Sequence, residues 1–378
     1  MRPAGEGERR ALGELFGALC AIESPYGRER ACADRVAGEL RALGLAVEED
    51  DAGAVAGSEA GNLLARLPSA DGGIEGGVLL CAHLDTVPLT GSVDPICEEG
   101  VWRNREDAIL GADNKAAVAV MLQAARRWIA ERPPVPVELL FTVCEEHALA
   151  GAKAFDASKL RSRFGYVFDH ATPIGEIVLA SPYYHRIVAE LRGVAAHAGI
   201  RPEAGRSAIV AAARAVAAMP LGRLDEETTA NVGTIAGGSG INVVPERCVV
   251  EAEVRSLDEA KVEALVSELV DHLTDGANAA ECDLDVTVAR LFHGYRLKPS
   301  APAIQCAEAA LRAAGHTPRH IVTGGGSDAN ALIAAGFPCV NLANGTEHPH
   351  QPNEQVTVAA LDAMLDVTFA LLDNAPDR

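Results

Sequence analysis

The sequence predicts an α/β fold in which a mostly parallel central sheet, flanked by helices, is interrupted by a smaller inserted α+β domain. Short continuous apolar runs alternate with amphipathic helical segments over most of the chain, which is typical of a parallel sheet covered on both faces. Residues 182–293 differ, because their strands alternate polar and apolar side chains. The length of 378 residues suits two domains, at ~150 residues per domain. We therefore expect a discontinuous domain, residues 1–181 and 294–378, and an inserted domain, residues 182–293.

The larger domain is predicted from its hydrophobic periodicity. Apolar residues at helical spacing predict helices over residues 12–22, 36–43 and 114–131, whereas the Ala- and Gly-rich residues 50–61 are expected to form a loop. Continuous apolar runs predict four buried strands, over residues 77–82, 135–144, 165–168 and 339–343.

The inserted domain is expected to have an open sheet face. Strands are predicted over residues 184–191, 248–254 and 284–289, and helices over residues 205–218 and 259–274. Alternating strands bury one face and leave the other to solvent.

Composition excludes several classes of function. The chain has 33 basic and 53 acidic side chains, a formal charge of −20, and an acidic surface repels the phosphates of nucleic acid. The nine cysteines are scattered without a CxxC pair, the N-terminus lacks the apolar core of a signal peptide, and no apolar run reaches the length of a membrane span. We expect a cytoplasmic protein that binds neither nucleic acid nor membrane.

Residues that bind metals follow the four predicted strands. The first strand leads into His83 and Asp85, the second into Glu145-Glu146, and the third into Asp169-His170. The fourth leads into a loop that contains Glu347, His348 and His350. Ligand sites in open α/β sheets lie at the carboxyl ends of the strands. His-x-Asp alone is a weak pattern, equally consistent with a solvated strand end, so the prediction depends on the recurrence.

Two carboxylate positions point to metal-assisted hydrolysis. Asp113 precedes the predicted helix 114–131, where it could be an N-cap, a carboxylate that bridges two cations, or both. Glu145 and Glu146 would repel each other unless a cation or proton compensates. Because adjacent side chains point in different directions, one can ligate a metal while the other addresses a water molecule. The neighbouring His147 is interpreted as a solvated or outer group.

The donor types favour zinc, with cobalt or manganese as possible substitutes, because His, Asp and Glu are present without Cys. No HExxH, GxSxG or Walker motif occurs. The glycine run Gly324–Asp328 is either an amide-lined anion pocket or a tight turn.

These motifs, in this order, resemble the dinuclear-zinc amidohydrolases that include peptidase T, carboxypeptidase G, aminoacylase and succinyl-diaminopimelate desuccinylase. The likeness extends over nearly the whole chain. It is carried by His83-Leu-Asp85-Thr-Val-Pro88, Gly111-Ala-Asp113-Asn-Lys115, Glu145-Glu146, Asp169 with Gly175-Glu176, Gly325-Gly-Ser-Asp328 and His350.

The resemblance implies a role for each motif residue. His83, Asp113 and Asp169 would hold one zinc, and Asp113, Glu146 and His350 would hold the other. Asp85 would orient His83, and Glu145 would activate a bridging water. Gly325, Gly326 and Ser327 are expected to contact the substrate.

The inserted segment resembles the lid and dimerisation domain of the same proteins. It contains Gly193-Val-Ala-Ala-His197-Ala-Gly199, Gly240-Ile-Asn242-Val-Val-Pro245 and Glu253-Val-Arg255. The resemblance implies that His197 reaches the scissile carbonyl oxygen and that Asn242 and Arg255 bind a carboxylate of the substrate. It also implies a homodimer in which His197 serves the zinc site of the partner. Without the motifs, His197 and Arg255 would be interpreted as ordinary surface residues.

Asp169 indicates the peptidase T branch, because an aspartate as third ligand goes with aminopeptidases and dipeptidases in this family. Three departures are Ala116 and His170, each in place of a usual glycine, and the extra histidine His348, which could compete with His350. The leading hypothesis is a zinc peptidase that cleaves short peptides from the amino end. The alternatives are an N-acyl amino acid deacylase or carboxypeptidase, and a catalytically silent metal-binding scaffold.

Overall fold

The computed structural model describes residues 2–375 and divides into two compact units. Unit 1 consists of the segments up to Leu179 and from Leu297 onward, and unit 2 consists of Ala180–Arg296. The sequence predicted the corresponding division at residues 182–293. Each unit has its own hydrophobic core, and each is described by itself below.

Unit 1 is built on a nine-stranded sheet whose four central strands are parallel, in the order β6, β3, β7, β16. These four strands correspond to the apolar runs of the sequence, and the predicted parallel centre of the sheet is confirmed. Antiparallel partners extend the sheet on both sides. The strands in spatial order are β1 (Val47–Glu49), β2 (Leu63–Leu67), β6 (Val137–Thr142), β3 (Val78–His83), β7 (Phe164–His170), β16 (Cys339–Ala343), β8 (Glu176–Ser181) and β14 (Tyr295–Arg296), with β15 (Arg319–Val322) paired to β8.

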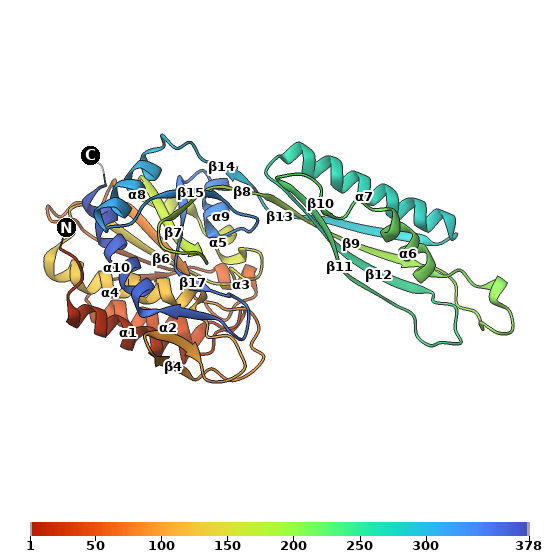
Figure 1. Cartoon of the computed structure of the whole chain (residues 1–378), viewed down its shortest axis with the longest axis horizontal. Helices are drawn as coiled ribbons and strands as arrows, with labels where there is room; N and C mark the ends of the chain where they lie inside the picture. The colour runs from red at the N-terminus through yellow and green to blue at the C-terminus, as the bar shows by residue number, and fades with distance from the viewer. Residues whose placement is uncertain (1, 376–378) are drawn as a thin grey trace. The chain divides into compact units, whose positions relative to one another are not determined.

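Helices cover both faces of this sheet (Figure 1). Strand β3 shows why: Leu80 and Ala82 join the core formed with the large helices, while the alternate residues Leu79 and Cys81 are buried on the opposite face. The large helices are α1 (Glu6–Cys20), α2 (Arg30–Ala42), α4 (Ala112–Glu131), α8 (Pro302–Ala313) and α10 (Val358–Asp373); shorter helices are α3 (Ala52–Ala56), α5 (Ala150–Ala154) and α9 (Asp328–Ala334). Helix α3 lies within residues 50–61, so the prediction of a loop there was wrong for those five residues. Within residues 2–375, no helix combines the length and apolar character that a membrane span requires.

A second, four-stranded sheet in unit 1 supports the loop that contains His350. Its strand order is β17 (Thr346–Glu347), β18 (Gln355–Thr357), β5 (Val101–Asn104) and β4 (Pro95–Glu98). Because β17 and β18 pair antiparallel, they clamp both ends of the loop formed by residues 348–354.

Unit 2 is a five-stranded antiparallel sheet with two helices on one face. The spatial order is β10 (Gly222–Arg223), β11 (Thr228–Gly237), β12 (Arg247–Ser256), β9 (Tyr183–Arg192) and β13 (Asp283–Phe292). Helices α6 (Ala208–Ala218) and α7 (Glu259–Ala279) pack on the face that contains Ile187, Ala189 and Leu191. The alternate side chains of β9 and β12 lie on the other face, as their sequence alternation predicts.

Candidate dinuclear metal site

The carboxyl ends of the parallel strands bring the predicted metal ligands together. His83 is the last residue of β3, Asp169 lies at the end of the neighbouring β7, and Glu145-Glu146 follow β6 on the other side of β3. His83 Nε2 lies 3.3 Å from Asp169 Oδ1 and 3.4 Å from Asp113 Oδ1. One histidine and two carboxylates thus converge on one point.

A second group forms around the other oxygen of Asp113. His350 Nε2 lies 3.6 Å from Asp113 Oδ2 and 2.8 Å from Glu146 Oε1. The two oxygens of Asp113 therefore face two different groups of ligands, which is the geometry of a carboxylate that bridges two cations.

The distances fit metal coordination. A tetrahedral ion with bonds of ~2.0–2.1 Å places its ligand atoms ~3.3 Å apart, close to the spacing around His83 Nε2. Asp113 Oδ1 is buried and has no hydrogen-bond partner, and such an oxygen is expected to ligate an ion or a water molecule. The contact between His350 and Glu146 has hydrogen-bond length and would have to open by about half an ångström around an ion.

Asp113 does not cap helix α4, so that interpretation was wrong. No side chain accepts a capping hydrogen bond at the start of α4, where Gly111 is the N-cap, and the helix is kinked at Asp113 and Asn114. Asp113 itself has non-helical backbone angles. Its side chain is therefore free for the site.

Asp85 holds two parts of the site. Its carboxylate accepts hydrogen bonds from the backbone N–H groups of Glu145 and Glu146, both at 3.0 Å. The ring of His83 is closer to the backbone carbonyl of Asp85 (Nδ1 to O, 2.9 Å) than to its carboxylate (Nδ1 to Oδ1, 3.5 Å). Asp85 thus orients His83 chiefly through its backbone and fixes the glutamate pair through its side chain.

Two further buried carboxylates position the site, and neither was predicted from the sequence to do so. Glu354, only 1% exposed, accepts hydrogen bonds from the N–H groups of Leu110, Gly111 and Asp113 at 2.7–2.8 Å. Glu29 is completely buried and accepts from the N–H of Cys144, next to Glu145. Both residues stand in polar stretches of the sequence, so no apolar pattern marks them as buried.

The charges of the site require compensation. Burial, together with the carboxylate of Asp169, raises the pKa of Glu145 well above its usual value. Burial likewise raises the pKa of Asp169 to about 8. Hydrogen bonds to Asp113 and Glu146 raise the pKa of His350 to about 10. The cluster gathers four carboxylates, and the pKa values of Glu145, Asp169 and His350 are raised. Divalent cations would compensate its negative charge and stabilise it.

Two histidines near the ligands stand apart from these groups. The ring of His147 stacks on Tyr26, with centroids 5.2 Å apart, which fits its interpretation as an outer group. His348 belongs to none of the metal-type clusters formed by residues 2–375, and it lines a cavity whose lining includes none of the proposed metal ligands. His350 is therefore the histidine that faces Asp113.

The glycine loop before α9 uses its amides internally. The N–H of Gly325 donates to Thr323 Oγ1 at 3.1 Å, and the N–H of Ser327 donates to Asn330 Oδ1 at 3.0 Å. Gly326 lies between them. This arrangement favours a tight turn over an anion pocket.

The predicted lid residues belong to unit 2. His197 and Asn242 are exposed and lie on neighbouring segments, joined by a hydrogen bond of 2.9 Å from the Ala198 N–H to the Asn242 carbonyl. Arg255, on β12, stacks over the ring of Tyr184 at 4.0 Å and pairs with Glu253 at 3.0 Å. Arg255 is thus held on strand β12, whereas His197 and Asn242 lie outside the named strands of unit 2.

Comparison with known proteins agrees with this geometry. Residues 79–374 match the model of peptidase family M20/M25/M40. The chain is 34% identical to the protein YqjE of Bacillus subtilis strain 168, over 97% of this chain and 99% of that protein.

Solved structures show the same fold over nearly the whole chain. The aminopeptidase PepT of Bacillus cereus ATCC 10987 is 36% identical, with a TM-score of 0.87 over 97% of this chain and 98% of that one. A tripeptidase of Staphylococcus aureus subsp. aureus Mu50 is 31% identical, with a TM-score of 0.90 over 96% and 97%. The family match, with these likenesses and the clustered metal ligands, shows that the chain is a metallopeptidase of family M20/M25/M40.

Proposed function

We propose that this protein is a dinuclear zinc peptidase that cleaves short peptides from the amino end, with Glu145 as the general base. The observation that carries the proposal is the shared carboxylate: Asp113 turns one oxygen toward His83 and the other toward His350. The ligands would be His83, Asp113 and Asp169 for one ion, and Asp113, Glu146 and His350 for the other. Histidine and carboxylate donors suit zinc, and they also accept cobalt or manganese.

Two such ions, when bound, would polarise the scissile carbonyl and lower the pKa of water. The protein residues supply the rest. Glu145 is 8% exposed and belongs to a cluster with His83 and Glu146 whose ligand atoms lie within 4.8 Å of one another. It would take a proton from the attacking water and pass it to the leaving amine.

The Glu145→Gln variant tests this role. Glutamine keeps the size of the side chain but cannot accept the proton, so turnover should fall by ~100-fold or more while both metals stay bound. The control is Glu146→Gln, which removes a proposed ligand and should lower the metal content as well. Near-normal kcat in Glu145→Gln would transfer the role of base to another residue, with Asp85 and His147 as the next candidates.

A substrate panel distinguishes the leading function from its alternatives. The zinc-loaded and cobalt-loaded protein is assayed against dipeptides, tripeptides, N-acylated peptides and N-acyl amino acids. Cleavage of the first bond of free peptides supports an aminopeptidase, as do Asp169 at the third ligand position and the likeness to the B. cereus and S. aureus enzymes. Preference for acylated substrates or for the carboxyl end would support a deacylase or carboxypeptidase. Bound metal without any hydrolysis would support a silent scaffold.

We also propose a cytoplasmic homodimer that associates through unit 2. All nine cysteines are free thiols, which suits a reducing compartment. Unit 2 has an uncovered sheet face, and its edge strand β13 is largely exposed, whereas exposed edges are usually paired or protected.

Complementation tests the dimer and the role of His197. Homodimers of Glu145→Ala and of His197→Ala should each be nearly inactive. In a mixed dimer with twofold symmetry, one site regains both groups, so random exchange of equal amounts should restore roughly a quarter of the wild-type activity. No recovery despite demonstrated exchange would mean that His197 acts within its own chain or not at all.

The other candidate substrate contacts can be tested by substitution, as effects on KM in the same assay. These residues are Asn242, Arg255, Gly325, Gly326 and Ser327.

A further inference from the structure

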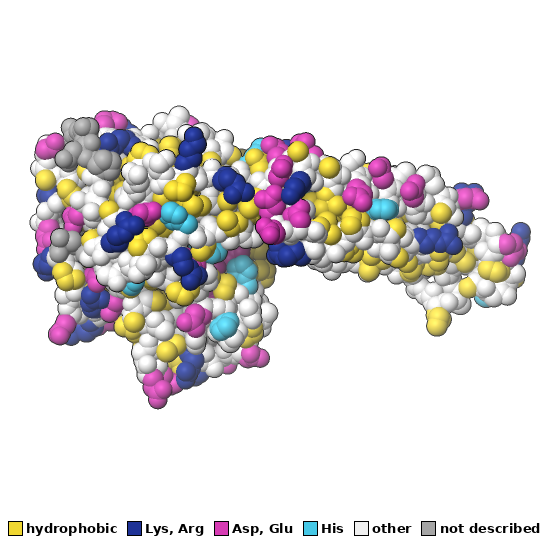
Figure 2. Space-filling model, turned by 45° about the horizontal axis from the view of Figure 1, so that its top comes forward, with side chains coloured by type: hydrophobic (Ala, Val, Ile, Leu, Met, Phe, Trp, Pro, Cys, Tyr) yellow, Lys and Arg dark blue, Asp and Glu magenta, His cyan; other side chains and the backbone are white. Residues whose placement is uncertain are grey.

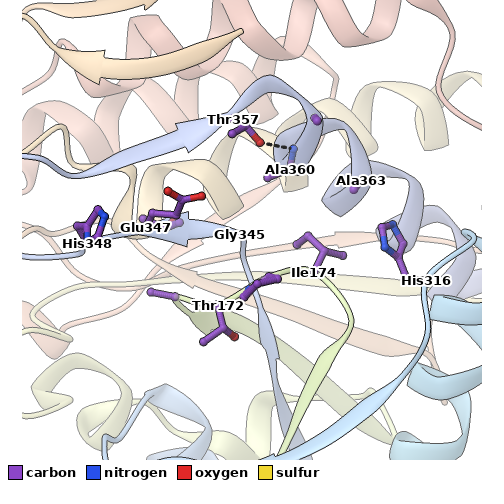
Figure 3. Close-up of a pocket in the computed structure, with 13 residues that line it drawn as sticks. Thr172, Ile174, His316, Gly345, Glu347, His348, Thr357, Ala360 and Ala363 are labelled. Carbon is purple, nitrogen blue, oxygen red and sulfur yellow. Dashed lines mark hydrogen bonds between the residues drawn. The ribbon is translucent and has the colours of Figure 1, made fainter.

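Unit 1 contains a cavity of about 600 Å³ whose lining includes none of the proposed metal ligands. Its walls come from residues 171–174 after β7, from residues 345–348 around β17, and from the first turns of α10. Figure 3 shows Glu347 and His348 at one end and His316 at the other, with Ile174 and Ala363 between them. The volume lies within the range of sites for small molecules, which is ~300–1,000 Å³.

The cavity adjoins the segments that carry two of the proposed metal ligands. The N–H of Asn344 donates to the carbonyl of His170 at 2.9 Å, and the N–H of Gly345 donates to the carbonyl of Thr172 at 3.0 Å. These bonds hold the two walls side by side. Glu347 is three residues before His350, and Thr172 is three residues after Asp169, so each Cα pair is at most ~11 Å apart. The cavity therefore borders the loops that carry these two ligands.

The lining is apolar with one fixed charge. Ile174, Ala360 and Ala363 form an apolar wall, and Glu347 is the only acidic or basic side chain, histidines aside, among the residues that line the cavity. Gln355 Nε2 donates to Glu347 Oε2 at 2.7 Å and holds the carboxylate in place. The exposed carboxylate keeps further acceptor capacity for a cationic donor. A ligand that matches this lining has an ammonium group beside an apolar side chain.

We propose that this cavity binds the amino-terminal residue of the substrate peptide. Glu347 accepts hydrogen bonds from the free α-ammonium group, and the apolar first side chain packs against Ile174 and Ala363. This inference rests on the proposed peptidase function and adds the feature that selects free peptides with an apolar first residue.

The test compares wild type and Glu347→Gln on two ligands. One is Leu-Gly-Gly, and the other is its desamino analogue, 4-methylpentanoyl-Gly-Gly, which keeps the side chain and lacks the amine. For wild type, KM for Leu-Gly-Gly should be about 10-fold lower than KM for the analogue. If the analogue is not cleaved, the comparison is with its inhibition constant. A factor of about 10 is what one charge-assisted hydrogen bond contributes to binding. Glu347→Gln should raise KM for Leu-Gly-Gly by about the same factor, with metal content and kcat retained and the analogue unaffected.

Two further variants control for charge and for the cavity itself. Glu99→Gln removes the same charge from an exposed turn between β4 and β5, and it should change neither constant. Ala363→Phe fills the apolar wall and should raise KM for Leu-Gly-Gly more than for Gly-Gly-Gly, with unchanged thermal unfolding showing that the variant is folded.

An unchanged KM for Leu-Gly-Gly in Glu347→Gln, with wild type active on it, would overturn the assignment of this cavity and leave the peptidase function intact. Wild type inactive on every peptide would instead remove the proposed function, and this inference with it.

Discussion

Glu354 offers the sharpest test of how this fold builds a metal site, because it contacts no proposed ion and yet fixes the bridging ligand. In Glu354→Gln, the amide oxygen can still accept from Leu110 and Gly111, which both donate to one carboxylate oxygen. The amide nitrogen then faces the N–H of Asp113, which donates to the other oxygen at 2.8 Å in the native protein. The glutamine amide N–H and the backbone N–H of Asp113 would then face each other in a buried position, where the Asp113 N–H has lost its acceptor.

The magnitude follows from this geometry. One hydrogen bond to a charged acceptor is worth about 1.5–3 kcal/mol, and the buried N–H left without a partner costs at least about 1 kcal/mol more, so the total is about 3 kcal/mol. Since 1.4 kcal/mol corresponds to a factor of about 10, metal affinity should fall by ~100-fold if the displaced Asp113 carries the whole effect. Both ions should be weakened together, because Asp113 faces both groups.

Competition with a fluorescent chelator measures the two affinities, and denaturant unfolding of the metal-free protein measures the stability. The matched control is Glu138→Gln, since Glu138 is 2% exposed and accepts from the N–H groups of Arg161 and Ser162 at the opposite end of β6 from the site. The control should lose stability and keep its metal affinity. Native metal affinity in Glu354→Gln would refute the claim that Glu354 positions Asp113.

Three other expectations concern the metal ligand, the response to acid and the core. Asp113→Ala should lower the content of both ions, and elemental analysis that finds two ions per chain in that variant would rule out the bridging role. Arg127 hydrogen-bonds to Glu8 and lowers the pKa of Glu8 from 4.5 to about 2. The stabilisation is therefore complete above pH 4.5 and is lost as the pH falls toward 2. Between pH 4.5 and 2, the free energy of unfolding of metal-free Glu8→Gln should change by about 1–2 kcal/mol less than that of the native protein, allowing for partial solvent screening. Equal slopes for both proteins would contradict the pairing of Glu8 with Arg127. Leu80→Ala, at a fully buried position of β3, should lower the free energy of unfolding by about 2–5 kcal/mol, whereas Leu221→Ala, at an exposed position, should lower it by less than about 1 kcal/mol.

The parallel sheet could be predicted because its central strands are buried on both faces. Continuous apolar sequence is the direct result of that burial, and β3, β6, β7 and β16 all show it. The strand ends then located His83 and Asp169, since parallel strands deliver their carboxyl ends to one edge.

Other elements have no such signal. Strand β11 contains two glycines and an irregular register near Gly233, which hides its alternation. Glu354 is even less visible, because the N–H groups that it contacts belong to residues 110–113, which are far from it in the sequence. The sequence left the role of Asp113 open between an N-cap, a bridging carboxylate and both, because sequence alone did not show how α4 begins.

The three inward carboxylates, Asp85, Glu354 and Glu29, imply that the site is ready before any ion arrives. Each one uses its oxygens on backbone N–H groups of a ligand-bearing loop, so these loops do not wait for metal to become ordered. Small zinc domains, by contrast, fold only as they bind. Here chelation should be reversible without unfolding. The metal ligands themselves can also be exchanged for one another over evolutionary time, because Asp85, Glu354 and Glu29 fix the backbone of the loops that carry them.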